Sequence, residues 1–274
     1  MRINDLSEGV IQVPDELTSY VMMITSKFLK GYLYCNFHKE LITNLEKRIG
    51  FISSNKQYLV CDIEESSGEF YEYDVDVSDV KYTDKSTDTL GIGIAYQNSS
   101  SNAMYLPDKN SILINLFKFI EQVDNLKQDS EDSEELMMRY ELVDAENRIA
   151  ELYNSFLSKL KGIVKHELAH FIQFRYLEDK SKEQVDTHGD YHQQFVEYSP
   201  WIISTIETVN LAKDEFNTKE LISYITAIID EKPKGLLFSE HGNSIENSHI
   251  FFRKLKNNKP SQWKKAIKYL IKEL

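Results

Sequence analysis

Apolar and polar residues recur with two different periods along the chain. Within 57–80, apolar residues at every second position from Tyr71 to Val77 alternate with acidic ones, which predicts a strand with one solvent-facing side. Residues 14–29 instead carry apolar residues at steps of three and four after a Pro-Asp-Glu start, which predicts a helix. Further strands are predicted at 58–63, 92–96 and 111–116.

After Phe119 the spacing is helical. Within 134–179 apolar residues follow steps of three and four without an interrupting proline, and the same stripe continues onto His166 and His170. A polar stretch at 178–190 is expected to break this helix. Helical spacing then resumes at 191–209 and 219–229, with Pro200 as an internal breaker.

These patterns together predict an α+β fold. An N-terminal helix and a mixed or antiparallel sheet with an edge strand occupy residues 1–120, and a mainly helical part occupies 121–274. The chain has 274 residues, of which 41% are hydrophobic, so the two parts can share one core and form a single compact domain.

The amino-acid composition restricts the cellular environment and the kinds of partner that we expect. No apolar stretch approaches the roughly 18 residues of a membrane span, and acids stand where a secretory signal carries bases, so we expect a cytoplasmic protein without membrane attachment. Cys35 and Cys61 form no CxxC pair, which fits a reducing compartment. The net charge of -12 argues against nucleic-acid binding. The segment 253–274 is nevertheless basic, and we expect two solvated helix faces or a docking contact with the acidic segment 121–148 or a partner.

The chemistry is carried by an HExxH sequence, His166 to His170. On a helix, residues four apart lie above one another, so both imidazoles can reach one metal ion, while Glu167 projects from nearly the same side. Zn²⁺ suits such a pair and leaves a coordination position for water. Glu167 would act as the general base on that metal-activated water during attack on a peptide carbonyl. The alternative is a pair of hydrogen-bonded core histidines.

The third zinc ligand is open on residue type and spacing alone. His188 is followed by Gly189, and this pair resembles the third-ligand segment of SprT-like proteases. A histidine at the edge of a polar stretch can equally be solvated. The downstream candidates are His188, His192, Glu197, Glu240 and His241.

A resemblance to a known group favours one of them. HELAHFIQFRY from His166, followed by YHQQFVEY from Tyr191, resembles bacteriophage-encoded HExxH zinc metallopeptidase-like proteins, as does the basic C-terminal segment. The resemblance covers residues 105–274 and implies a zincin-like fold with Glu197 as third ligand, a gluzincin-like set. Phe195 stands where the group usually has proline, and Pro200 where it has a small residue, so His188 stays the alternative.

Two functions are therefore expected. The first is a zinc metallopeptidase, an endopeptidase acting on protein or peptide substrates, with Tyr191 and Tyr198 as candidate oxyanion donors beside the more general role of packing. The second is a non-catalytic structural or interaction protein that retains the zincin-like fold and binds virion or host proteins in the host cytoplasm or the virion. The intact Glu167 favours the first, because a structural zinc site needs no general base.

Overall fold

The computed structural model describes residues 10–36, 49, 71–76, 89–96, 102–131, 138–184, 197–229 and 242–273. It divides into two compact units. The sheet unit comprises residues 16–75 and 89–160, and the helical unit comprises 1–15, 76–88 and 161–274. The elements in chain order are α2 (Asp15–Asn36), β1 (Tyr71–Asp76), β2 (Thr89–Ala95), β3 (Ala103–Leu106), η1 (Pro107–Lys109), β4 (Ser111–Asn115), α4 (Phe117–Glu131), α5 (Met138–Gln184), α6 (Tyr198–Glu215), α7 (Thr218–Ile229), α8 (Gly242–Asn258) and α9 (Pro260–Glu273).

The sheet has four strands in the order β1-β2-β4-β3. β2 runs parallel to β4, with Gly91 opposite Ser111, and β3 runs antiparallel to β4, with Ala103 opposite Ile114. The sheet is therefore mixed. The tight connection from β3 to β4 passes through η1 and Asn110, whose φ of 48° is a left-handed conformation that asparagine tolerates well.

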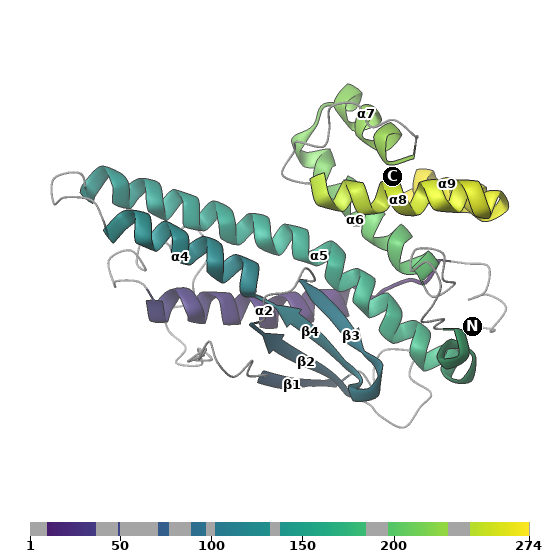
Figure 1. Ribbon diagram of the computed structural model, residues 1–274, viewed down its shortest axis with the longest axis horizontal. Helices are drawn as coiled ribbons and strands as arrows, with labels where there is room; N and C mark the ends of the chain where they lie inside the picture. Colours follow the sequence, from purple (N-terminus) through teal and green to yellow (C-terminus); the bar gives the residue numbers. More distant parts are fainter. Residues whose placement is uncertain are drawn as a thin grey trace. The chain divides into compact units, whose positions relative to one another are not determined.

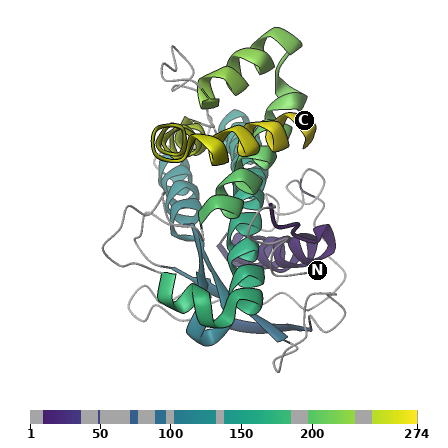
Figure 2. The ribbon, with the colours of Figure 1, turned by 90° about the vertical axis from the view of Figure 1, so that its right-hand side faces the viewer.

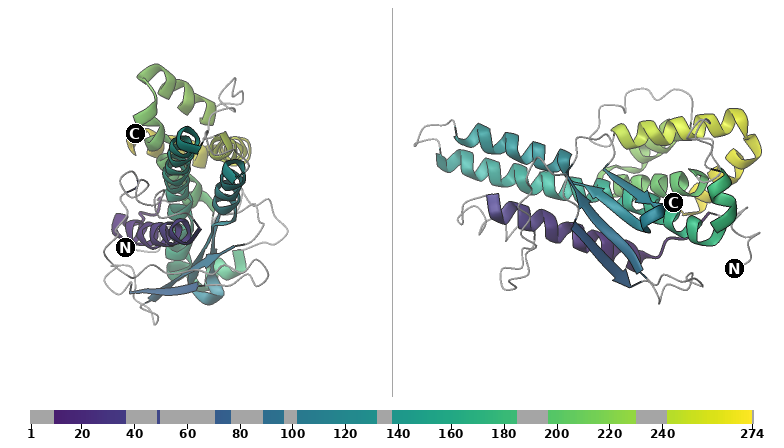
Figure 3. Two further views of the ribbon diagram at one scale, coloured as in Figure 1. Left: turned by 90° about the vertical axis from the view of Figure 1, so that its left-hand side faces the viewer. Right: turned by 60° about the horizontal axis from the view of Figure 1, so that its bottom comes forward.

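Helices supply the rest of the sheet unit. Figure 1 and Figure 3 show α4 running beside the first part of α5, with α2 nearby. Two buried or half-buried tyrosine hydroxyls link these helices: Tyr32 on α2 donates to Asp124 on α4 at 2.5 Å, and Tyr153 on α5 lies 2.6 Å from the Ser26 hydroxyl on α2. The apolar faces of the helices and strands form the core, which includes Val21, Phe28, Leu33, Ile92, Ile112, Ile114, Phe119 and Val123.

The helical unit has its own core, built from α6 to α9. Figure 2 shows α8 and α9, in yellow, running in clearly different directions. Trp201 and Trp263 pack against this core, as expected of anchoring residues. Its buried members are Ile202, Val209, Tyr224, Ile228, Phe251, Phe252, Leu255, Ala266 and Leu270.

The α+β prediction is confirmed, as are the helix begun near Pro14, the strands near Ile92 and Ser111, and the long helix through His166. Three local features of the structure differ from the sequence prediction. β3 was not predicted, α5 continues to Gln184 through part of the predicted break, and Pro200 lies in the first turn of α6. Proline is tolerated there because first-turn amides have no partner within the helix.

Other predictions are left open. The strand predicted at 58–63 lies outside the described residues, and the division expected after residue 120 stays a prediction. None of the helices in the described part of the chain combines the length and apolar character that a membrane crossing needs.

Candidate metal centre

His166 and His170 lie one turn apart on α5, within the helical unit. The helix keeps them on its buried face, between Val164 and Phe171, which are fully enclosed. Only 6% of His166 and 8% of His170 is exposed. The helical spacing therefore places two imidazoles side by side away from bulk water, as the sequence predicts.

Glu197 lies directly before the first residue of α6 and is only 3% exposed. Its neighbours in the chain are firmly packed. The backbone amide of Ile11 donates to the Ser199 hydroxyl at 3.3 Å. The Trp201 ring meets the His166 ring edge-on, with centroids 4.9 Å apart, and also stacks on the Phe251 ring, with centroids 6.3 Å apart. The start of α6 is thus fixed against α5 by apolar contact as well as by hydrogen bonding.

These three side chains converge on one point. The two Nε2 atoms are 3.2 Å apart, Glu197 Oε2 is 3.4 Å from His166 Nε2, and Glu197 Oε1 is 3.3 Å from His170 Nε2. Around a tetrahedral zinc ion with ligands at about 2.0–2.1 Å, neighbouring ligand atoms are about 3.3 Å apart. The cluster therefore fits zinc, and among the described residues it is the group of three metal-binding side chains that the structure brings together.

The electrostatics of the cluster favour a cation. Burial alone would lower the pKa of His170, but the Glu197 carboxylate outweighs burial, Glu167 adds to its effect, and the pKa is raised. Burial alone would raise the pKa of Glu197, but the two imidazoles lower it to about 2. Two nitrogen lone pairs and a carboxylate held this close need a proton or a metal ion between them.

Glu167 follows His166 on α5 and is half-buried. Its charge reaches the His170 imidazole and contributes to the raised pKa of that group. Glu167 is thus a partly exposed carboxylate whose charge acts on one of the two imidazoles, and its role as general base stays a prediction.

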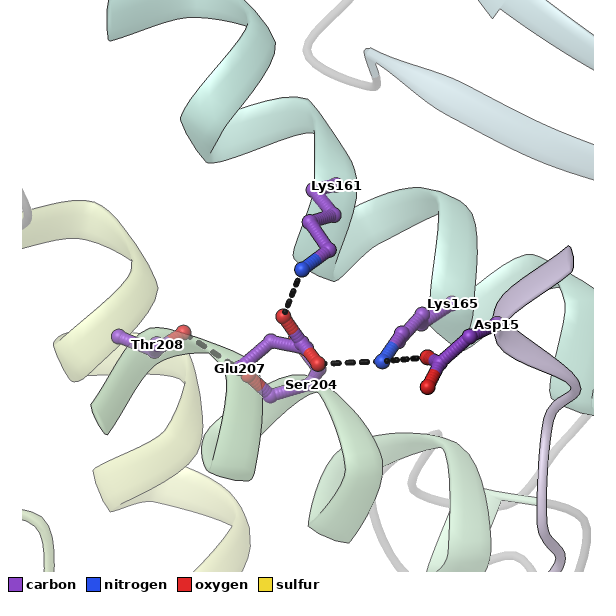
Figure 4. A network of polar contacts seen from close by, with 6 residues as sticks. All are labelled: Asp15, Lys161, Lys165, Ser204, Glu207 and Thr208. Atoms are coloured by element: carbon purple, nitrogen blue, oxygen red, sulfur yellow. Dashed lines mark hydrogen bonds and ion pairs between the residues drawn. The ribbon is translucent and has the colours of Figure 1, made fainter. Parts of the chain in front are cut away.

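A charged cluster joins α5 to α6 next to this site (Figure 4). Lys161 lies 3.2 Å from Glu207, and Lys165 contacts both Glu207 and, at 3.0 Å, Asp15. Burial alone would lower the pKa of Lys165, but the two carboxylates outweigh it, so the pKa is raised. We call Lys161, Lys165, Glu207 and Asp15 the lysine clamp. Because Lys165 immediately precedes His166, the lysine clamp fixes the α5 turn that carries the first imidazole.

Other predicted site residues lie elsewhere. The Tyr198 hydroxyl donates to the Gln262 carbonyl at 3.3 Å, and burial raises its pKa to about 12. Its role as an oxyanion donor stays a prediction. The remaining candidates lie outside the described residues: His188, Tyr191, His192, Glu240 and His241.

Sequence reasoning missed two features of the site. Glu207 was not considered, although an acid near the middle of α6 is a natural partner for two lysines one turn apart on α5. Gln173 was also missed, although it lies three residues after His170 and so one turn further along the same side of α5.

Comparisons of the chain with models of known protein families, with characterised proteins and with solved structures found no match.

Proposed function

We propose that this protein is a zinc-dependent peptidase in which His166, His170 and Glu197 hold the ion. The convergence of their ligand atoms to 3.2–3.4 Å in a buried site is the observation that carries the proposal. The set of two histidines and one glutamate is the one that the resemblance to bacteriophage-encoded metallopeptidase-like proteins implies. Bound zinc would polarise a water molecule and lower its pKa to about 7.

The chain itself supplies the proton transfers. The Glu167 carboxylate would accept a proton from the attacking water and deliver it to the leaving amine nitrogen of the peptide. Glu167 is suited to this role rather than to zinc binding, because it is not among the three residues whose ligand atoms converge. An acid in this place distinguishes a hydrolytic site from a closed structural one.

Zinc content tests the ligand set. We expect one zinc ion per chain in the purified protein, and loss of stoichiometric zinc in the single variants His166→Ala, His170→Ala and Glu197→Ala. His249→Gln is the matched control, since His249 is a buried histidine on α8 outside the cluster. Full zinc content in all three ligand variants would rule out this site.

Cleavage of a peptide library or an unfolded protein tests the role of Glu167. Glu167→Gln keeps the shape of the side chain but removes the base, so we expect normal zinc content and a fall in kcat/KM of about 10²–10⁴-fold. Glu151→Gln removes an exposed acid from the same helix and serves as the control. Zinc binding without any cleavage by the wild type would instead support a non-catalytic role.

A further inference from the structure

His170 has one ring nitrogen at the cluster and one away from it. Nε2 faces Glu197 at 3.3 Å. If Nε2 is to offer its lone pair to a metal ion, the neutral imidazole must carry its proton on Nδ1. Nδ1 is buried and has no hydrogen-bond partner among the residues that the structure describes. A buried N–H group without an acceptor lowers the stability of the folded protein by about 1–3 kcal/mol. We therefore expect Nδ1–H to have an acceptor.

The side chain of Gln173 is a candidate for this acceptor. Its side chain is only 3% exposed, and its Oε1 is a buried acceptor that likewise lacks a partner in the described part of the chain. Residues three apart on a helix are neighbours on one side, so the side chains of Gln173 and His170 lie on the same side of α5.

We propose that Gln173 is a positioning residue of the metal centre, with its Oε1 accepting a hydrogen bond from His170 Nδ1–H. This hydrogen bond would satisfy both buried atoms at once and fix the tautomer that presents Nε2 to the ion. Zinc-binding histidines usually donate their second ring N–H to a carbonyl or carboxylate, and loss of that acceptor costs about 10–100-fold in metal affinity. The inference rests on the proposed zinc site.

Zinc affinity of two variants tests the proposal. Gln173→Leu replaces the acceptor by an apolar group of similar size, and we expect zinc dissociation constants about 10–100-fold higher in a chelator competition at neutral pH. Gln173→Glu keeps an acceptor and adds charge to it, so this variant should bind zinc at least as tightly as the wild type.

A spectroscopic measurement separates positioning from general packing. In zinc-loaded protein, the His170 Nδ1 proton should give a slowly exchanging NMR signal that Gln173→Glu retains and Gln173→Leu loses. Thr25→Val is the control for loss of a buried polar group, because Thr25 is fully enclosed on α2 in the sheet unit. It should lower stability without changing zinc affinity or the signal.

The outcomes are distinguishable. Wild-type zinc affinity in Gln173→Leu would overturn the role of Gln173 and leave the zinc site standing. Equally weakened zinc binding in Gln173→Glu and Gln173→Leu would also overturn the role of Gln173, because the acceptor that Gln173→Glu retains would then not contribute to zinc affinity. Failure of the wild type itself to bind zinc would overturn the proposed function, and this inference with it.

Discussion

Gly91 and Gly162 sit in different packing environments and should respond oppositely to an added methyl group. A Cβ on Gly91 would lie 2.9 Å from Ser111 Cβ on the facing strand, too close to be accommodated without moving β2 or β4. A Cβ on Gly162, within α5, would meet its nearest neighbour, Glu207 Cβ, at an ordinary 3.6 Å.

We therefore expect Gly91→Ala to lower the free energy of unfolding by about 1–3 kcal/mol, through overpacking. Gly162→Ala should raise it by about 0.5–1 kcal/mol, because alanine loses less backbone entropy than glycine in a helix. Urea unfolding of both variants measures the two changes. Changes of the same sign would contradict the close approach at Gly91 or the ordinary contact distance at Gly162.

At this same scale, sequence reasoning succeeded where the geometry is local. His166 and His170 could be paired from their spacing because a helix fixes what lies four residues away. Glu197 could not be chosen from spacing, since the distance along a chain between two elements does not say how those elements pack. The structure brings Glu197 to both imidazoles through contacts that involve Trp201 and Ser199.

At the scale of elements, the lysine clamp ties α5 to α6. Glu207 is nearly enclosed, with 9% of its side chain exposed, and Lys165 has 12% exposed, whereas Lys161 has 46% exposed. Glu207→Ala leaves the Lys165 ammonium in a poorly hydrated place without its main partner. We expect this variant to lose about 1–3 kcal/mol in the free energy of unfolding.

Lys161→Met is the comparison, and it should lower the free energy of unfolding by about 0–1 kcal/mol because the Lys161 side chain is exposed to water. The effect of Glu207→Ala should also depend on pH. The clamp raises the folded-state pKa of Lys165 above its ordinary 10.5, so its stabilisation is complete below pH 10.5 and is lost as pH rises through the folded-state value. In urea unfolding, the difference in free energy of unfolding between wild type and Glu207→Ala should be smaller at alkaline than at neutral pH. An equal difference at both pH values would contradict the role of the Lys165–Glu207 ion pair.

Element boundaries show what local pattern could and could not predict. The helices and the strands at Ile92 and Ser111 follow from apolar periodicity. β3 was not predicted because four residues between two turn-forming clusters are too few to show an alternation of apolar and polar positions. It forms a strand because it pairs with β4. The prediction that Pro200 interrupts a helix was wrong, because proline is tolerated in the first turn of a helix and disrupts only its interior. The structure shows that α6 begins at Tyr198, which places Pro200 in the first turn.

At the scale of the whole molecule, zinc should stabilise the two compact units unequally. The three proposed ligands all belong to the helical unit. Free zinc at about 100 times its dissociation constant adds about 2.7 kcal/mol to the stability of whatever unfolds together with the site. We expect chelation to lower the Tm and to increase hydrogen exchange in 161–184 and in α6 first.

Hydrogen exchange in α4, which belongs to the sheet unit, provides the internal comparison. Its protection should change less than that of α6 when zinc is removed. Uniform loss of protection in both units would show that they unfold as one, and no change in either would argue against a metal site in the helical unit.

The pairing of His170 with Glu197 has a topological meaning as well as a chemical one. An ion held by both residues would cross-link the chain around residues 171–196, as a disulfide closes a loop. The entropic cost of closing a loop grows only with the logarithm of loop length. Doubling the length of this segment would therefore raise the free energy of loop closure by about 0.6 kcal/mol. Relatives of this chain could therefore carry long insertions between the histidine helix and α6 and still bind their ion with nearly the same affinity.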